Sequence, residues 1–131
     1  WELVKNKEVN SYSAIETIFD VYKTNKNYVV YDSETRDSIY KIYGFNIVDN
    51  HTHSTSSEIK ALYNLEVDYF IEGRLDLLEN SAELELSLYS IDKNNLIKIN
   101  SVKEEFDDDS RMVFLEFVTR AAKKLMELNS K

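Results

Sequence analysis

A chain of 131 residues fits a single domain with one hydrophobic core, so we expect residues 1–131 to form one domain. The absence of cysteine excludes disulfides, thiolate metal sites and cysteine nucleophiles. A net charge of −8 argues against nucleic acid as the partner, and no apolar run is long enough for direct membrane insertion.

The first half of the chain predicts helices joined by short connections. The chain begins at Trp1 rather than at methionine, so we interpret it as a piece of a longer chain in which residues 1–10 are a linker or the remnant of a strand. Apolar residues at helical spacing and a β-rich run then predict, in order, a helix over Ser11–Lys23, a short strand over Tyr28–Asp32, a helix over Glu34–Tyr43 that stops at Gly44, a polar loop over Phe45–Ser56 and a short helix over Ser57–Tyr63.

The second half predicts an antiparallel meander followed by a long helix. Apolar and polar residues alternate over Val67–Leu77 and again from Ala82 to Leu88, which is typical of strands with one wet face. A more polar strand over Leu96–Phe106 follows a turn, and Ser110–Leu128 has the apolar stripe of a helix. The pattern therefore predicts an α/β (α+β) fold with a mixed sheet of about four strands. An antiparallel meander spans 67–106, and three to four helices, including a long C-terminal helix, pack on the sheet.

A two-residue loop at Glu79 and Asn80 sets the register of the first hairpin, because paired positions then sum to 159. This register places Phe70 opposite Tyr89 on the charged face of the sheet, and Ile91 extends the pair. Two interpretations remain open: the three residues are an exposed anchor for a protein partner, or one of the first three helices covers them as core. On the dry side, we expect nearly complete burial of Ile71, Leu84, Leu86, Phe117, Val118 and Ala121.

Three segments, in this order and spacing, resemble the TolB amino-terminal-like domain: Tyr28–Asp32 (YVVYD), Leu62–Gly73 (LYNLEVDYFIEG) and Leu84–Asp92 (LELSLYSID). This superfamily includes the curli-secretion lipoprotein and the penicillin-binding-protein activator lipoproteins. The similarity covers about residues 11–128, but the opening strand of the family is not evident, and asparagine replaces the glycine of the turn before residue 96.

The resemblance implies a non-catalytic protein–protein interaction domain of a bacterial envelope protein, periplasmic or outer-membrane-associated. Its partner would be another envelope protein or another domain of the parent chain. The alternative is a small-molecule or lipid carrier with a cavity between sheet and helices. The sequence shows no glycine-rich phosphate loop and no nucleophile elbow, so we expect neither an enzyme nor a bound cofactor.

His51 and His53 are the two histidines of the chain, and neutral imidazoles can ligate zinc. A stable site needs three or four converging ligands, which one loop rarely holds in place, so we expect no metal site. Zinc in modest excess should therefore leave the melting temperature unchanged, as measured by circular dichroism. A clear rise that disappears when both histidines are replaced by alanine would contradict this expectation.

Overall fold

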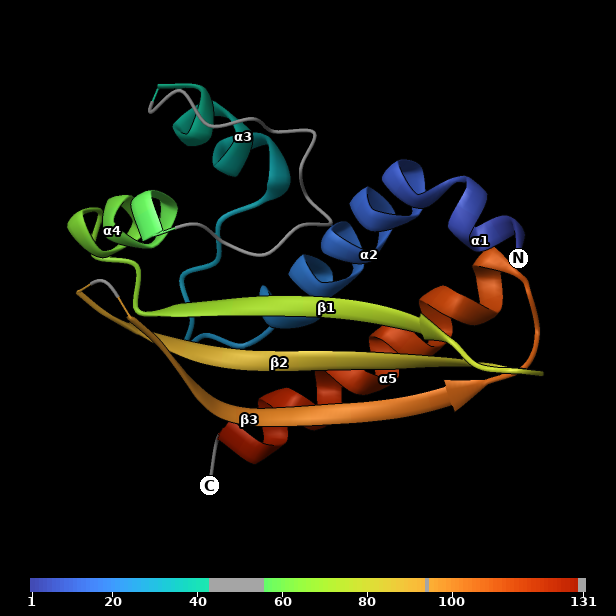
Figure 1. Cartoon of the computed structure of the whole chain (residues 1–131). Coiled ribbons are helices and arrows are strands. Elements are labelled where there is room, and N and C mark those ends of the chain that lie inside the picture. Colours follow the sequence, from blue (N-terminus) through green and yellow to red (C-terminus); the bar gives the residue numbers. More distant parts are fainter. Residues whose placement is uncertain (43–55, 94, 130–131) are drawn as a thin grey trace.

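The computed structural model describes residues 1–42, 56–93 and 95–129. Its centre is a three-stranded antiparallel sheet in the order β1-β2-β3, with bounds Tyr69–Leu77, Ala82–Asp92 and Asn95–Phe106 (Figure 1). The helices are α1 (Glu2–Lys5), α2 (Lys7–Tyr22), α3 (Ser33–Ile42), α4 (Ser56–Asn64) and α5 (Arg111–Asn129). The chain therefore has the predicted α+β character, with a long C-terminal helix.

The helices are arranged around this sheet in two groups. Helix α5 lies along one face and packs against β2 and β3, and α2 packs along α5 (Figure 1). Helix α3 contacts α2, whereas α4 contacts the ends of β2 and β3 at the turn that joins them. Within the described ranges, one sheet face is thus covered by α5 along its length, and α4 lies at the end of the sheet nearest the β2–β3 turn.

The sheet has three strands in the described ranges, not the four predicted, and it is antiparallel throughout. The missing strand is Tyr28–Asp32, which forms part of the connection between α2 and α3. Valine and tyrosine there favour a strand, but a strand also needs a neighbour that exchanges hydrogen bonds with it. The segment is held instead by Tyr28, whose ring packs edge-on against Tyr22 and Tyr69 and whose hydroxyl accepts a hydrogen bond from Asn129.

Residues 2–5 form α1 and residues 7–10 begin α2, so the expectation of a linker or strand remnant over residues 1–10 was wrong. The carboxylate of Asp109 accepts hydrogen bonds from the backbone N–H groups of Glu2, at 2.6 Å, and Leu3, at 3.1 Å. These are donors that the first turn of α1 leaves without an intrahelical partner. The Leu3 side chain is buried, and the Trp1 ring contacts Phe106 edge-on at 5.8 Å. Contacts with Phe106 and Asp109, which are more than a hundred residues away in sequence, therefore stabilise this helix.

The predicted register of the first hairpin is confirmed. All nine pairs from Tyr69↔Ser90 to Leu77↔Ala82 sum to 159, and Leu78 N donates to Ser81 O at 2.8 Å across the tight turn. The second hairpin contains a β-bulge, because the register shifts by one residue between Leu88 and Tyr89. Gly44, residues 45–55 and both histidines lie outside the described residues.

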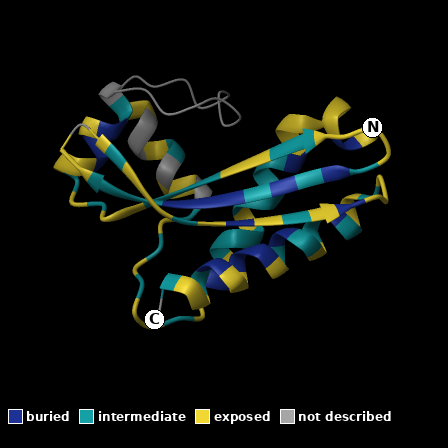
Figure 2. Cartoon of the chain, turned by 60° about the horizontal axis from the view of Figure 1, so that its bottom comes forward, coloured by how far each residue is buried: buried dark blue, intermediate teal, exposed yellow. Residues whose placement is uncertain are grey.

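The core lies between the sheet and α5 (Figure 2), and four of the six predicted core residues are confirmed as buried: Leu84, Leu86, Val118 and Ala121. Ile71 and Phe117 are only partly buried, so the expectation of nearly complete burial was wrong for these two. Ile71 belongs to an edge strand, which has a neighbour on one side. Phe117 stacks on Phe106 with ring centroids 5.4 Å apart, and its other face carries the Arg120 guanidinium rather than apolar core.

Replacing Leu86 by alanine should lower the free energy of unfolding by about 2–5 kcal/mol, because the side chain is only 1% exposed and the cavity cannot close completely. The matched control is Leu78→Ala, since Leu78 is 46% exposed and should cost less than about 1 kcal/mol. Urea unfolding of both variants measures the difference. Equal losses would contradict the burial of Leu86.

The hydroxyl of Tyr22 is buried and has no hydrogen-bond partner among the described residues. Burial, with a smaller contribution from neighbouring Tyr28, raises the pKa of Tyr22 well above its usual value of 10.0. In the unfolded chain this phenol ionises near its usual pKa, whereas in the folded protein it stays neutral to higher pH. Tyr22 therefore makes the folded state lose stability as pH rises above its unfolded pKa.

Replacing Tyr22 by phenylalanine should leave stability at neutral pH unchanged or raise it by up to about 1 kcal/mol, because an unsatisfied hydroxyl is removed. Above the usual tyrosine pKa, the stability advantage of Tyr22→Phe over the wild type should grow with pH. Urea unfolding at a series of alkaline pH values measures this difference. A difference that is constant with pH would show that the phenol ionises equally in both states.

Candidate functional site

The candidate site lies on the sheet face opposite α5. The odd residues of β1 and the even residues of β2 pack against the core. Because side chains alternate along a strand, the even residues of β1 and the odd residues of β2 belong to the opposite face. Its side chains from these two strands are Phe70, Glu72, Arg74, Asp76, Glu83, Glu85, Ser87, Tyr89 and Ile91. The face is therefore charged along most of its length and apolar at the end nearest the β2–β3 turn.

The structure brings together the three residues that the sequence singled out. Phe70 pairs with Tyr89 across β1 and β2, and Ile91 follows two residues later on the same face. We call Phe70, Tyr89 and Ile91 the aromatic patch. Each of these side chains has intermediate exposure, so the patch is neither a fully exposed anchor nor ordinary core.

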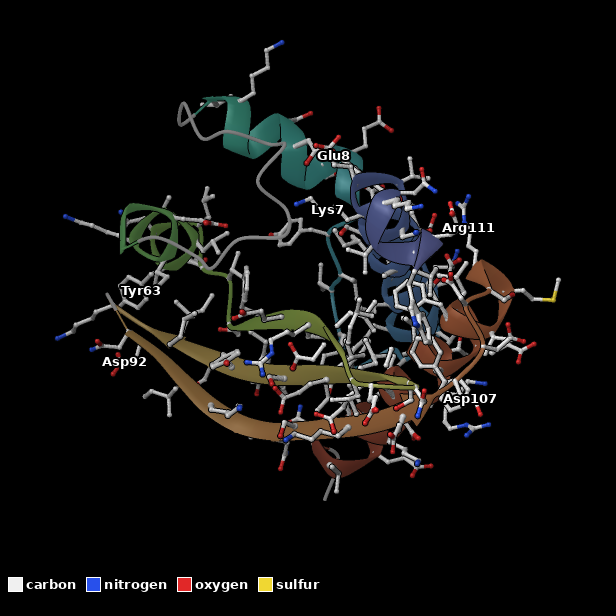
Figure 3. All side chains as sticks on the ribbon, turned by 45° about the vertical axis from the view of Figure 1, so that its right-hand side comes forward. Lys7, Glu8, Tyr63, Asp92, Asp107 and Arg111 are labelled. Carbon is white, nitrogen blue, oxygen red and sulfur yellow. The ribbon has the colours of Figure 1, made fainter. Side chains whose placement is uncertain are left out.

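Helix α4 lies at the same end of the sheet as the patch. It contacts β2 and β3 near their turn, and Figure 3 shows Tyr63 of α4 close to Asp92, the last residue of β2. Ile59 and Leu62 of α4 are buried, yet neither belongs to the core between the sheet and α5. These two side chains are therefore buried outside that core.

Two further residues join this face from β3, and the sequence analysis did not identify them. On one side of the bulge the odd residues Ser101, Lys103 and Glu105 pair with this face of β2, but beyond it Lys98 pairs with Tyr89 and Leu96 with Ile91. The bulge exchanges odd for even positions, so simple alternation through β3 would place Leu96 and Lys98 on the other face. The sequence signal is the interrupted apolar pattern of residues 96–99.

Charges surround the patch, and acidic groups predominate among them. Carboxylates of Glu72, Asp76, Glu83, Glu85 and Glu105 share the face with Arg74, Lys98 and Lys103. Arg74 donates two hydrogen bonds to the Asp76 carboxylate, at 2.9 and 2.7 Å, rather than pairing with Glu85 across the strands. Those hydrogen bonds, and then the negative charges of Asp76, Glu85 and Glu83, raise the pKa of Arg74.

An open groove of about 390 Å³ lies between α2 and α5. Its lining residues are Thr17, Asp20, Val21, Thr24, Thr119, Lys123 and Met126. The hydroxyls of Thr17 and Thr24 donate to carbonyls of α2, and that of Thr119 donates to a carbonyl of α5, so they are not aimed at a ligand. This groove separates two helices, whereas the carrier hypothesis requires a cavity between sheet and helices.

The described part of the chain contains no group of three or more histidine, cysteine, aspartate or glutamate side chains that could hold a metal ion. Nor is any helix within it long and apolar enough to cross a bilayer. In comparisons with known proteins, no family model, no curated protein and no solved structure matches this chain.

Proposed function

We propose that this chain is a non-catalytic protein-interaction domain of a bacterial envelope protein and that its partner contacts the aromatic patch. The observation that carries the proposal is the cross-strand pair Phe70–Tyr89 on a charged face that α5 does not cover. Aromatic side chains ringed by polar groups are where binding free energy concentrates in protein interfaces.

The surroundings of the patch favour a protein partner over a small molecule. The patch continues into Leu96 and Lys98 on β3, so a binding surface extends over all three strands. A surface spread over three strands suits a protein partner, whereas small ligands are held in concave sites that bury most of their surface. The acidic groups beside the patch favour a partner with basic residues at its rim, because opposite charges across an interface speed association.

The location in the envelope comes from the resemblance to the TolB amino-terminal-like domain. Phe70 lies within Leu62–Gly73, one of the three segments that carry it. On this basis, the domain is periplasmic or outer-membrane-associated, and it binds another envelope protein or another domain of its parent chain.

Replacing Phe70 and Tyr89 together by serine should weaken partner capture at least tenfold, about 1.4 kcal/mol, while the circular dichroism spectrum is retained. The measurement is quantitative mass spectrometry of proteins captured from a bacterial envelope extract by immobilised wild type and variant. The matched control replaces Val9 and Met112, which are exposed and lie on helices, by serine. It should capture partners as the wild type does.

Two outcomes of this experiment would contradict the proposed site. A double variant that no longer folds would show that Phe70 and Tyr89 are core residues beneath α4. A folded double variant that retains full capture would place the interface elsewhere on the domain.

A further inference from the structure

The outer edge of β1 is a second surface, distinct from the aromatic patch. In the sheet as described, β1 pairs with β2 alone. Two backbone hydrogen bonds, Leu78 N to Ser81 O and Ile91 N to Asp68 O, show that even-numbered residues exchange hydrogen bonds with β2. The odd-numbered residues of β1 therefore direct their N–H and C=O groups away from the sheet.

This edge is open to solvent and regular. Gly73 at its centre is exposed, and the side chains at its two ends, Tyr69 and Leu77, are 43% and 45% exposed. All nine pairs of β1 with β2 keep one register. The opposite edge, β3, is interrupted by a bulge and carries Lys98 and Lys103, which are features that discourage further pairing.

We propose that β1 pairs antiparallel with β1 of a second copy of this chain, with Gly73 of each copy facing Gly73 of the other. The two sheets then form one continuous antiparallel sheet of six strands around a twofold axis. On the face toward α5, Ile71 lies opposite Leu75 of the second copy, and Tyr69 opposite its Leu77. On the other face, Glu72 lies opposite Arg74 of the second copy, and the twofold axis repeats this pair.

The charges on β1 favour this register over the registers that are centred on the adjacent residues. Pairing through the outward groups requires odd residues opposite odd residues. Among such arrangements, centres at Glu72, Gly73 and Arg74 keep at least seven of the nine residues of β1 paired. A centre at Glu72 places Glu72 of one copy opposite Glu72 of the other. A centre at Arg74 places Arg74 opposite Arg74 and Glu72 opposite Asp76. Of these three centres, only Gly73 avoids like charges at both positions and gives two oppositely charged pairs. A centre at Leu75 would place Arg74 opposite Asp76, but it pairs only residues 73–77 of β1, whereas the centre at Gly73 pairs the whole strand.

The geometry of the central pairs supports the same choice. Glu72 and Arg74 are even residues, so in this arrangement they form non-hydrogen-bonded pairs, in which side chains of adjacent strands approach most closely. Arg74 would then lie between Asp76 of its own strand and Glu72 of the second copy. At the axis, Gly73 carries no side chain, so no bulky group separates the two copies there.

Sedimentation equilibrium of the whole chain tests this proposal without reference to any other partner. The wild type should associate reversibly to a dimer. Glu72→Lys and Arg74→Glu should each weaken the dimer at least tenfold, because each change creates two like-charge pairs. An equimolar mixture of these two variants should dimerise again, since the introduced lysine of one variant then faces the introduced glutamate of the other. The remaining pair in that mixed dimer is the native one, Arg74 opposite Glu72.

The control is Glu105→Lys, which makes the same change of charge on this face but lies on β3, at the opposite edge of the sheet. It should leave the association unchanged, and circular dichroism checks the fold of every variant. A wild type that stays monomeric at all accessible concentrations would overturn the proposal. So would a dimer that neither edge variant weakens, or a mixture of folded variants that remains monomeric.

Discussion

The packing of β2 against α5 is the contact on which the rest of the structure depends. β2 is the central strand, and its Ala82, Leu84, Leu86 and Leu88 are all buried on the side that faces the helix. The side chains of α5 in this core are also fully buried: Val118, Ala121, Ala122 and Leu125. Two alanines in this set let the helix approach the sheet closely, and close packing makes such an interior sensitive to the loss of a single side chain.

This contact determines what the other side of the sheet can do. Side chains alternate along a strand, so burying the even residues of β2 under α5 turns its odd residues outward. The outward set is charged except near the β2–β3 turn, where Tyr89 and Ile91 meet Phe70 and Leu96. At that end the bulge brings Leu96 and Lys98 beside Tyr89 and Ile91, and α4 contacts β2 and β3. The packing of β2 against α5 therefore determines which side chains form the proposed partner surface.

The amino-terminal elements depend on the same framework. Helix α2 packs along α5, and α1 is tied by its backbone to Asp109, directly before α5. Tyr22, at the end of α2, is buried in this framework, and its hydroxyl has no hydrogen-bond partner among the described residues. The two proposed contact surfaces, one on the open sheet face and one along the β1 edge, both lie on strands that α5 holds in place. The sheet face would bind through side chains, whereas the β1 edge would bind mainly through backbone groups. One domain can therefore carry both surfaces.

The sequence by itself determined the parts of the structure that repeat locally. Alternation over 67–77 and 82–88, joined by a two-residue loop, determined the register of the first hairpin and hence the Phe70–Tyr89 pair. The long apolar stripe likewise identified α5 to within a residue at each end. These features follow from the periods of strand and helix, which any short window of sequence displays.

Only the tertiary structure decided the features that depend on distant residues. Helix α1 is stabilised by Asp109, which accepts hydrogen bonds from its first turn from more than a hundred positions away along the chain. Tyr28–Asp32 is not a strand because no neighbour pairs with it in the described residues, although its composition suits one. The residues that lie beside the aromatic patch depend on the bulge, which brings Leu96 and Lys98 to the same face. A local pattern indicates which side of an element is apolar, but what covers that side is decided by contacts between segments that are far apart in sequence.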